Sequence, residues 1–269
     1  MRAPLAVCGN VSIDLIDGQP PTVGGGPYHC GLGLRLLERP ARIVTKCAPD
    51  DRSLLVPQLA ALGVPLTVVD AERTASFALF YEGEVRRTEI RAVGDAWTPD
   101  DAARVGDAAW VYVAALTRSD FPAETLEALA RGRNLAFDGQ GLVRAPEEGP
   151  VRYDPALDSA LLRHVSFLKL AEEEATAILP AVTEAAVFAL GVPEVVVTLG
   201  SRGSVVYADG ASTPVPCRPI LDVDLTGCGD VFGVGYVAAR SDGLGPASAA
   251  RRATALVALL LTNRKRVRR

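Results

Sequence analysis

The chain has 269 residues and a formal net charge of −4, and 49% of its residues are hydrophobic. This length is enough for one large domain with a buried core, while the negative charge excludes the overall basic surface through which proteins bind nucleic acid. Five cysteines without a CxxC pair, and two histidines, exclude a multi-histidine metal centre and indicate reduced thiols in a cytosolic protein.

Short apolar runs alternate with helical patterns along most of the chain. Strands that are buried on both faces of a parallel sheet are continuously apolar, which predicts strands over Leu5–Gly9, Arg42–Cys47, Leu66–Asp70, Trp110–Ala114, Leu135–Asp138, Phe167–Leu170 and Val195–Leu199. Helices are predicted over Tyr28–Leu37, Leu54–Leu62, Ala123–Arg131 and Glu172–Leu179. Strands that alternate with helices indicate an α/β fold with a doubly wound, mostly parallel sheet flanked by helices.

Two segments interrupt this alternation with the pattern of β-hairpins. Ser76–Tyr81 and Val85–Ile90 flank a glycine-containing turn at 82–84. Together with Val11–Ile16 they are expected to form a small sheet outside the main layer. Ser204–Ala208 and Thr213–Val215 flank an Asp-Gly turn and predict a second hairpin, on the edge of the main sheet.

The ends of the chain bear on its location. Met1–Pro4 lead directly into a strand-like run, without the long apolar stretch of a signal peptide. The longest apolar run, Ala253–Leu261, is too short to span a membrane. We therefore expect a cytoplasmic protein with no membrane partner. The basic cluster Arg264–Arg269 is typical of a solvated terminal tail.

The strongest chemical signal is a glycine-rich segment, D-L-T-G-C-G-D, which spans 224–230 and runs into an apolar pattern with helical spacing. A helix N-terminus attracts anions because its backbone N–H groups point outward and the helix dipole favours negative charge. Gly227 and Gly229 lack the Cβ atoms that would keep a phosphate away from those amides. Asp230 then lies beside the anion, where a carboxylate can take the proton of a hydroxyl that attacks phosphorus.

This segment resembles the C-terminal signature D-T-x-G-A-G-D of the ribokinase (PfkB) family, with Leu225 and Cys228 as departures. The resemblance implies an ATP-dependent carbohydrate kinase with Mg²⁺ as a cofactor. It implies one ribokinase-like domain over residues 1–269, with a small β-lid from about 11–26 and 75–91. Asp230 would be the catalytic base, and Gly227, Cys228 and Gly229 would form the anion hole. A monovalent cation is implied near Asp224, where Leu225 alters the signature.

Further matches to the family concern the phosphate acceptor. The run G-N-V-S-I-D at 9–14 resembles the first strand of the family, which implies that Asp14 accepts hydrogen bonds from substrate hydroxyls. Gly24, Gly25 and Gly26, followed by His29, resemble the N-terminal glycine signature, which would let backbone amides approach a polyol closely. A flexible loop before a helix is the alternative interpretation of these glycines.

The donor side depends on two other segments. L-K-L-A-E-E-E at 168–174 resembles the N-x-x-E motif with Ala in place of Asn, which assigns Lys169 to the nucleotide and Glu174 to water around Mg²⁺. Acidic residues at a helix start are also favourable for the dipole alone. The segment at 198–203 resembles the nucleotide loop, so Thr198, Gly200 and Gly203 are expected to contact ATP.

The segment F-D-G-Q-G-L-V-R at 137–144 bears on the identity of the acceptor. Several sugar kinases of the family have D-x-N-x-R here, whereas this pattern resembles a subgroup that includes myo-inositol kinases. Gln140 would bind a ring hydroxyl, and Arg144 the substrate or the transferred phosphate; a surface ion pair is the alternative role of Arg144. The expected acceptor is a cyclitol or similar polyol, with a pentose, a hexose derivative or a nucleoside as alternatives.

Other hypotheses stay open from the sequence. A nucleoside kinase of the same family would differ in its acceptor. A nucleotide- or sugar-binding sensor that lost turnover would explain Ala171 and Leu225, but it would not need Asp230 with both glycines. A dinucleotide-binding oxidoreductase fits least, because no clean G-x-G-x-x-G joins a strand to a helix. The resemblance also leaves open a homodimer formed through the lid.

Overall fold

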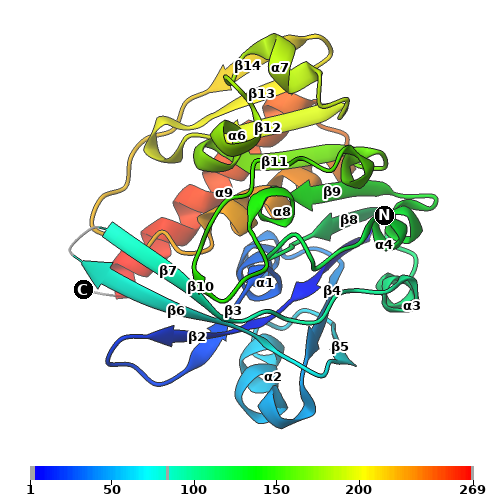
Figure 1. The fold of residues 1–269 in the computed structure, drawn as a ribbon. Helices are drawn as coiled ribbons and strands as arrows, with labels where there is room; N and C mark the ends of the chain where they lie inside the picture. The colour runs from blue at the N-terminus through cyan, green and yellow to red at the C-terminus, as the bar shows by residue number, and fades with distance from the viewer. Residues whose placement is uncertain (1–3, 83–84, 268–269) are drawn as a thin grey trace.

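The computed structural model describes residues 4–82 and 85–267 of the chain. In this part, the main sheet has nine strands in the order β14-β13-β12-β11-β9-β8-β1-β4-β5 (Figure 1). They are β1 (Leu5–Asn10), β4 (Ala41–Cys47), β5 (Leu66–Asp70), β8 (Trp110–Val113), β9 (Asn134–Asp138), β11 (Phe167–Ala171), β12 (Glu194–Thr198), β13 (Ser204–Ala208) and β14 (Ala211–Val215). All pairings from β5 across to β12 are parallel, while β13 and β14 form the predicted antiparallel hairpin at one edge.

Helices cover both faces of this sheet, and alternate residues of β1 show why both faces are apolar. Leu5 and Val7 join the core beneath α1 (Gly26–Leu37), α2 (Arg52–Ala60), α8 (Cys228–Ser241) and α9 (Pro246–Val267). Ala6 and Cys8 join the opposite core, beneath α3 (Pro99–Ala102), α4 (Ala123–Ala130), α5 (Gln140–Val143), α6 (Glu172–Ile178) and α7 (Glu184–Phe188). Short 3₁₀ helices lie at Pro49–Asp51, Ala103–Val105, Ser159–Leu162 and Gly200–Arg202. The predicted α/β fold with a mostly parallel, helix-flanked sheet is confirmed.

A second, five-stranded sheet in the described part has the order β10-β7-β6-β2-β3. Its strands are β2 (Ser12–Ile16), β3 (Thr22–Gly24), β6 (Ala75–Glu82), β7 (Val85–Ala92) and β10 (Gly149–Pro150). Figure 1 shows that β2 leaves the end of β1, so the chain passes from the main sheet into the small one within a single residue. The small sheet was predicted from β2, β6 and β7; part of the turn at 82–84 lies outside the described residues.

No helix within the described ranges is long and apolar enough to cross a bilayer.

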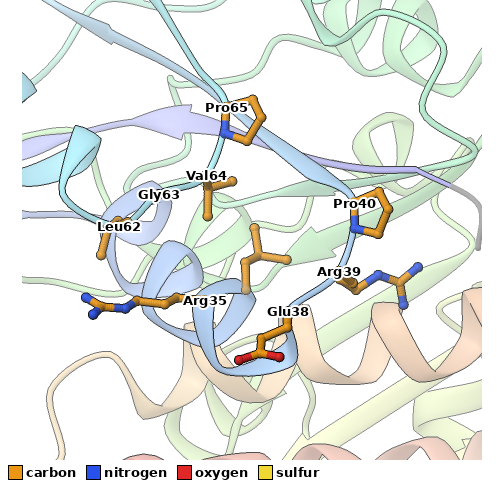
Figure 2. Close-up of a pocket in the computed structure, with 9 residues that line it drawn as sticks. Arg35, Glu38, Arg39, Pro40, Leu62, Gly63, Val64 and Pro65 are labelled. Carbon is orange, nitrogen blue, oxygen red and sulfur yellow. The ribbon is translucent and has the colours of Figure 1, made fainter.

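A cavity of about 330 Å³ lies at the C-terminal end of α1, between Arg39 and the turn at Gly63 (Figure 2). Arg39 at its edge donates from Nη1 to the Ala238 carbonyl of α8 at 2.8 Å. Since a helix rises about 1.5 Å per residue, the length of α1 separates this cavity from the N-terminal end of the helix.

Candidate active site

A larger cavity, of about 630 Å³, lies where the N-termini of α1 and α8 face the small sheet. The small sheet contributes Phe77 and Leu79 of β6 and Arg87 of β7. Most of the residues that the sequence assigns to a site meet here: the cavity is lined by Asp14, Gly25, Gly26, His29, Gln140, Arg144, Glu174, Gly227, Cys228, Gly229 and Asp230. Segments as far apart in sequence as those that carry Asp14 and Asp230 therefore form one site.

The glycine-rich segment forms the expected turn into a helix, with Gly227 as the N-cap of α8 at φ 75°. A Cβ at Gly227 would overlap the ring of His29, so His29 packs directly on this glycine. At Gly229, a Cβ would lie 3.3 Å from the Lys169 ammonium nitrogen. Burial raises the pKa of the Cys228 thiol to about 11, against the effect of Arg264. The start of α8 thus presents backbone amides and a neutral thiol, with an ammonium nearby.

Asp230, in the first turn of α8, is 9% exposed. Its Oδ1 is buried and has no hydrogen-bond partner among the described residues. A Cβ added at Gly26 would come within 3.0 Å of this oxygen, which places the start of α1 against the carboxylate. Burial raises the pKa of Asp230 to about 7, and the charge of Asp138 adds to the rise, while Lys169 opposes it. The side chain is therefore suited to exchange a proton near neutral pH.

One wall of the cavity is built on β2 and β3, which pair in antiparallel register with Ser12 opposite Gly24. Asp14 Oδ1 accepts a hydrogen bond from Ser12 Oγ at 2.7 Å. A Cβ at Gly24 would overlap the Asp14 carboxylate, so this glycine makes room for the aspartate. Ser12 was not predicted, although its spacing of two from Asp14 puts both side chains on one face of a strand.

Gln140 and Arg144 approach the cavity from α5 and its C-terminal end. The Gln140 backbone N–H donates to Asp138 Oδ1 at 3.2 Å, and its side-chain amide nitrogen lies 3.4 Å from the same oxygen. The Arg144 guanidinium lies over the ring of Phe77, 5.8 Å from its centroid, and its Nε is buried. Arg144 at the end of α5 therefore contacts the small sheet through Phe77, and both residues line the cavity.

Lys169 and Glu174, both predicted as site residues, form a group of buried charges with Asp138, and the contacts within this group were not predicted from the sequence. Lys169 Nζ lies 3.1 Å from Asp138 Oδ2 and 3.8 Å from Glu174 Oε2, and the Lys169 and Asp138 side chains are 4% and 0% exposed. The Tyr112 hydroxyl donates to Asp138 Oδ2 at 2.6 Å. Burial works against the charged form of Lys169, but Asp138 and Glu174 outweigh it and raise the pKa of the ammonium. Lys169 is thus held as a cation next to Gly229.

Glu174 is the residue that the sequence assigns to water around Mg²⁺, and its surroundings show whether it could hold that ion. Its Oε2 accepts a hydrogen bond from the Ala171 N–H at 2.7 Å, and its side chain lines the cavity. Across the residues that the structure describes, no group of three or more His, Cys, Asp or Glu side chains could hold a metal ion. Mg²⁺ keeps several waters and binds through one or two carboxylates plus substrate phosphates. A single Glu174 at the cavity wall fits such a water-mediated contact.

The other residues that the sequence assigns to the donor lie apart from the lining of this cavity. The Thr198 hydroxyl donates to the Leu170 carbonyl at 3.3 Å, at the end of β12. Gly203 has φ 97°, and a Cβ there would overlap the Val215 carbonyl, so packing against the end of β14 already requires glycine. Gly200 has φ 57° and no heavy atom within 4 Å of an added Cβ. Asp224 Oδ1 accepts a hydrogen bond from the Thr226 N–H at 2.9 Å.

The prediction of a solvated basic tail is wrong for Arg264 and Lys265. These residues belong to the last turn of α9, and both donate hydrogen bonds to backbone carbonyls of the loop at 221–226. A block of like charges says nothing about carbonyls about 40 residues away in sequence, so the sequence pattern could not reveal these contacts.

The architecture matches solved kinases over nearly the whole chain. A sulfate complex of a pyrophosphate-dependent kinase in the ribokinase family has a TM-score of 0.84 at 24% identity, over 96% of this chain and 95% of that one. A similar kinase with a pyrophosphate analog and myo-inositol has a TM-score of 0.83 at 23% identity, with the same coverage. Arabidopsis thaliana ribokinase with ribose and ATP has 0.75 at 22%, over 97% and 93%. The fold is therefore that of the ribokinase-like kinases.

Sequence comparison gives the family. Residues 44–266 match the pfkB family of carbohydrate kinases, and the chain belongs to that family. Inositol 3-kinase of Zea mays is 35% identical over 132 residues, which are 47% of this chain. That match spans 33% of the length of the maize protein.

Proposed function

We propose that this protein transfers a phosphoryl group to a hydroxyl of a small polyol, with a cyclitol such as myo-inositol as the preferred acceptor. One observation carries the proposal: Asp230, the glycine-rich start of α8 and the Asp14 carboxylate line a single cavity. A base, an anion site and a hydroxyl-binding carboxylate are the groups that this transfer needs. The likeness to a kinase that was solved with myo-inositol supports the choice of acceptor.

In this proposal, Asp230 accepts the proton of the acceptor hydroxyl as its oxygen attacks the terminal phosphorus of the donor. The bond from that phosphorus to the donor's bridging oxygen breaks, and the electron pair stays on the leaving phosphate. The amides of Gly227, Cys228 and Gly229 stabilise the charge on the transferred group, with the Lys169 ammonium beside them. Glu174 would hold Mg²⁺ through water, and that ion, when bound, neutralises charge on the donor phosphates.

The small sheet acts as the lid of this site in our proposal. Phe77, Leu79 and Arg87 line the cavity from β6 and β7, opposite the start of α8. A sheet that covers the acceptor keeps water away from the transferred phosphate, which protects the donor from hydrolysis.

Asp14→Ala is expected to raise the KM for the acceptor by about 10- to 100-fold, because a hydrogen bond to a charged group contributes about 1.5–3 kcal/mol. The KM for the donor should change little. Steady-state kinetics with each substrate varied in turn measures both constants. Ser12→Ala is the matched control, since it removes one neighbour of Asp14 and keeps the carboxylate, so its effect should be smaller. Equal increases in both KM values would remove Asp14 from the acceptor site.

We propose ATP as the donor, supported by the likeness of this fold to a ribokinase that was solved with ribose and ATP, and pyrophosphate is the second candidate. The cavity reaches the start of α8, and Thr198, Gly200 and Gly203 are not part of its lining. Pyrophosphate has no nucleoside and would need no contact with these three residues. Similarity to pyrophosphate-dependent kinases supports pyrophosphate as the donor. Calorimetric titration with a non-hydrolysable ATP analogue and with a pyrophosphate analogue distinguishes the two. ATP as donor predicts tighter binding of the nucleotide, whereas equal or tighter binding of the pyrophosphate analogue would contradict it.

A further inference from the structure

The last turn of α9 holds the loop that leads into the glycine-rich start of α8. Arg264 Nη1 donates to the backbone carbonyl oxygens of Asp224 and Thr226, each at 2.8 Å. Lys265 Nζ donates to the Leu221 carbonyl of the same loop at 2.9 Å. Since Thr226 directly precedes Gly227, the guanidinium places a positive charge next to the proposed donor site.

Two carbonyl oxygens that point at one position form the kind of site that binds a hard cation. The family resemblance implies a monovalent cation near Asp224. The residues of this chain do not fit such an ion, because Arg264 Nη1 is already within hydrogen-bond distance of both carbonyl oxygens. A metal ion and this nitrogen could not share the position.

We propose that Arg264 takes the place of the monovalent cation, so that donor binding at the start of α8 does not depend on potassium. An arginine stays charged at every physiological pH and can donate to both carbonyls at once. Its place in the last turn of α9 is favourable for a cation, because the C-terminal end of a helix carries partial negative charge. The charge of Arg264 also lowers the pKa of the Cys228 thiol, against the larger effect of burial, so its field reaches the donor site.

The test compares donor binding and thermal melting in KCl and in tetramethylammonium chloride at equal ionic strength. The donor-binding measurement rests on the proposed function. The melting measurement uses no donor and does not depend on that function. For the unmodified protein, the Kd of a non-hydrolysable ATP analogue and of a pyrophosphate analogue should agree between the two salts within about twofold. The melting temperature should agree as well.

Arg264→Ala is expected to weaken donor binding by about tenfold or more in tetramethylammonium chloride, because hydrogen bonds to a charged group are lost. Potassium should then restore part of the affinity and raise the melting temperature, since it can bind the two uncovered carbonyls. Arg264→Lys keeps the charge and should stay closer to the unmodified protein. Arg266→Ala, which removes an exposed charge two residues away, is the matched control and should change neither quantity.

Two results would overturn the proposal. The first is an unmodified protein whose donor affinity or melting temperature rises with potassium. The second is an Arg264→Ala variant that responds to potassium no more than the Arg266→Ala control does. If neither donor analogue binds the unmodified protein in either salt, the proposed donor site is wrong, and the melting comparison still decides the role of Arg264.

Discussion

Asp230→Asn is expected to lower kcat by about 10²- to 10⁴-fold, the range that general-base catalysis contributes, while donor binding stays close to that of the unmodified protein. Asparagine keeps the size of the side chain, but it cannot accept the proton of the acceptor hydroxyl. The Asp230 Oδ1 atom that would take this proton is buried and lies against Gly26 at the start of α1. Steady-state kinetics and calorimetric donor titration measure the two effects separately.

The matched control for this substitution is Asp107→Asn, which changes a carboxylate that is 84% exposed and pairs with Arg42 at the surface. Surface pairs of this kind contribute little to stability, so its kcat should be unchanged. A kcat for Asp230→Asn within a few-fold of the control would remove Asp230 from the catalytic step.

Because the pKa of Asp230 is raised to about 7, we expect both the activity and the stability of the protein to depend on pH near neutrality. A base must be ionised to accept a proton, so kcat/KM should rise with pH up to about 7 and then level off. Because the pKa in the folded state lies above its ordinary value, the fold favours the neutral acid, and that stabilisation is lost as the pH rises through 7. Asp230→Asn should therefore melt at a higher temperature than the unmodified protein at pH 8. The difference should shrink toward pH 4.

Gly227→Ala is expected to lower activity by more than about 10²-fold, because it disturbs the donor site and the acceptor side together. Gly227 has φ 75°, and an added Cβ would overlap the His29 ring, so both the backbone and His29 must shift. The start of α8 then loses the geometry in which its amides converge on a phosphate. Kinetics together with calorimetric donor titration should show weaker donor binding as well as a lower kcat.

Gly63→Ala is a close control, since Gly63 has φ 71° but no heavy atom within 4 Å of an added Cβ. It carries the same backbone strain, about 1–2 kcal/mol, without a steric clash and away from the proposed site. It should lower the melting temperature and leave activity intact. If the two alanine variants retained equal activity, the close packing at Gly227 would have no role in the reaction.

The main sheet could be predicted from the sequence because its strands are buried on both faces and appear as continuous apolar runs. β5 matches its predicted bounds fully, and β1 differs by one residue. β3 and β10 were missed because two or three residues are too few to show any periodicity. The order of the strands in the main sheet was also out of reach, since β1 pairs in parallel with β8, with Leu5 opposite Trp110.

The site could be predicted in part for a related reason. Residues such as Gly227 and Asp230 are close in sequence and share one helix start, so their proximity follows from local structure. The contact between Asp138 and Lys169 depends on β9 and β11 being neighbours in the sheet, with these two residues in register. The Arg264 contacts depend on where a long helix ends. Neither placement follows from a sequence pattern.

The most direct measurement is ³¹P NMR of the unmodified protein with Mg²⁺, either ATP or pyrophosphate, and a panel of myo-inositol, other cyclitols, ribose, fructose and adenosine. We predict a new phosphomonoester signal that is strongest with a cyclitol and is lost with Asp230→Asn. A signal that is strongest with adenosine would favour a nucleoside kinase instead. If no acceptor gave a phosphomonoester while the donor still bound, the proposal of phosphoryl transfer at this site would be contradicted.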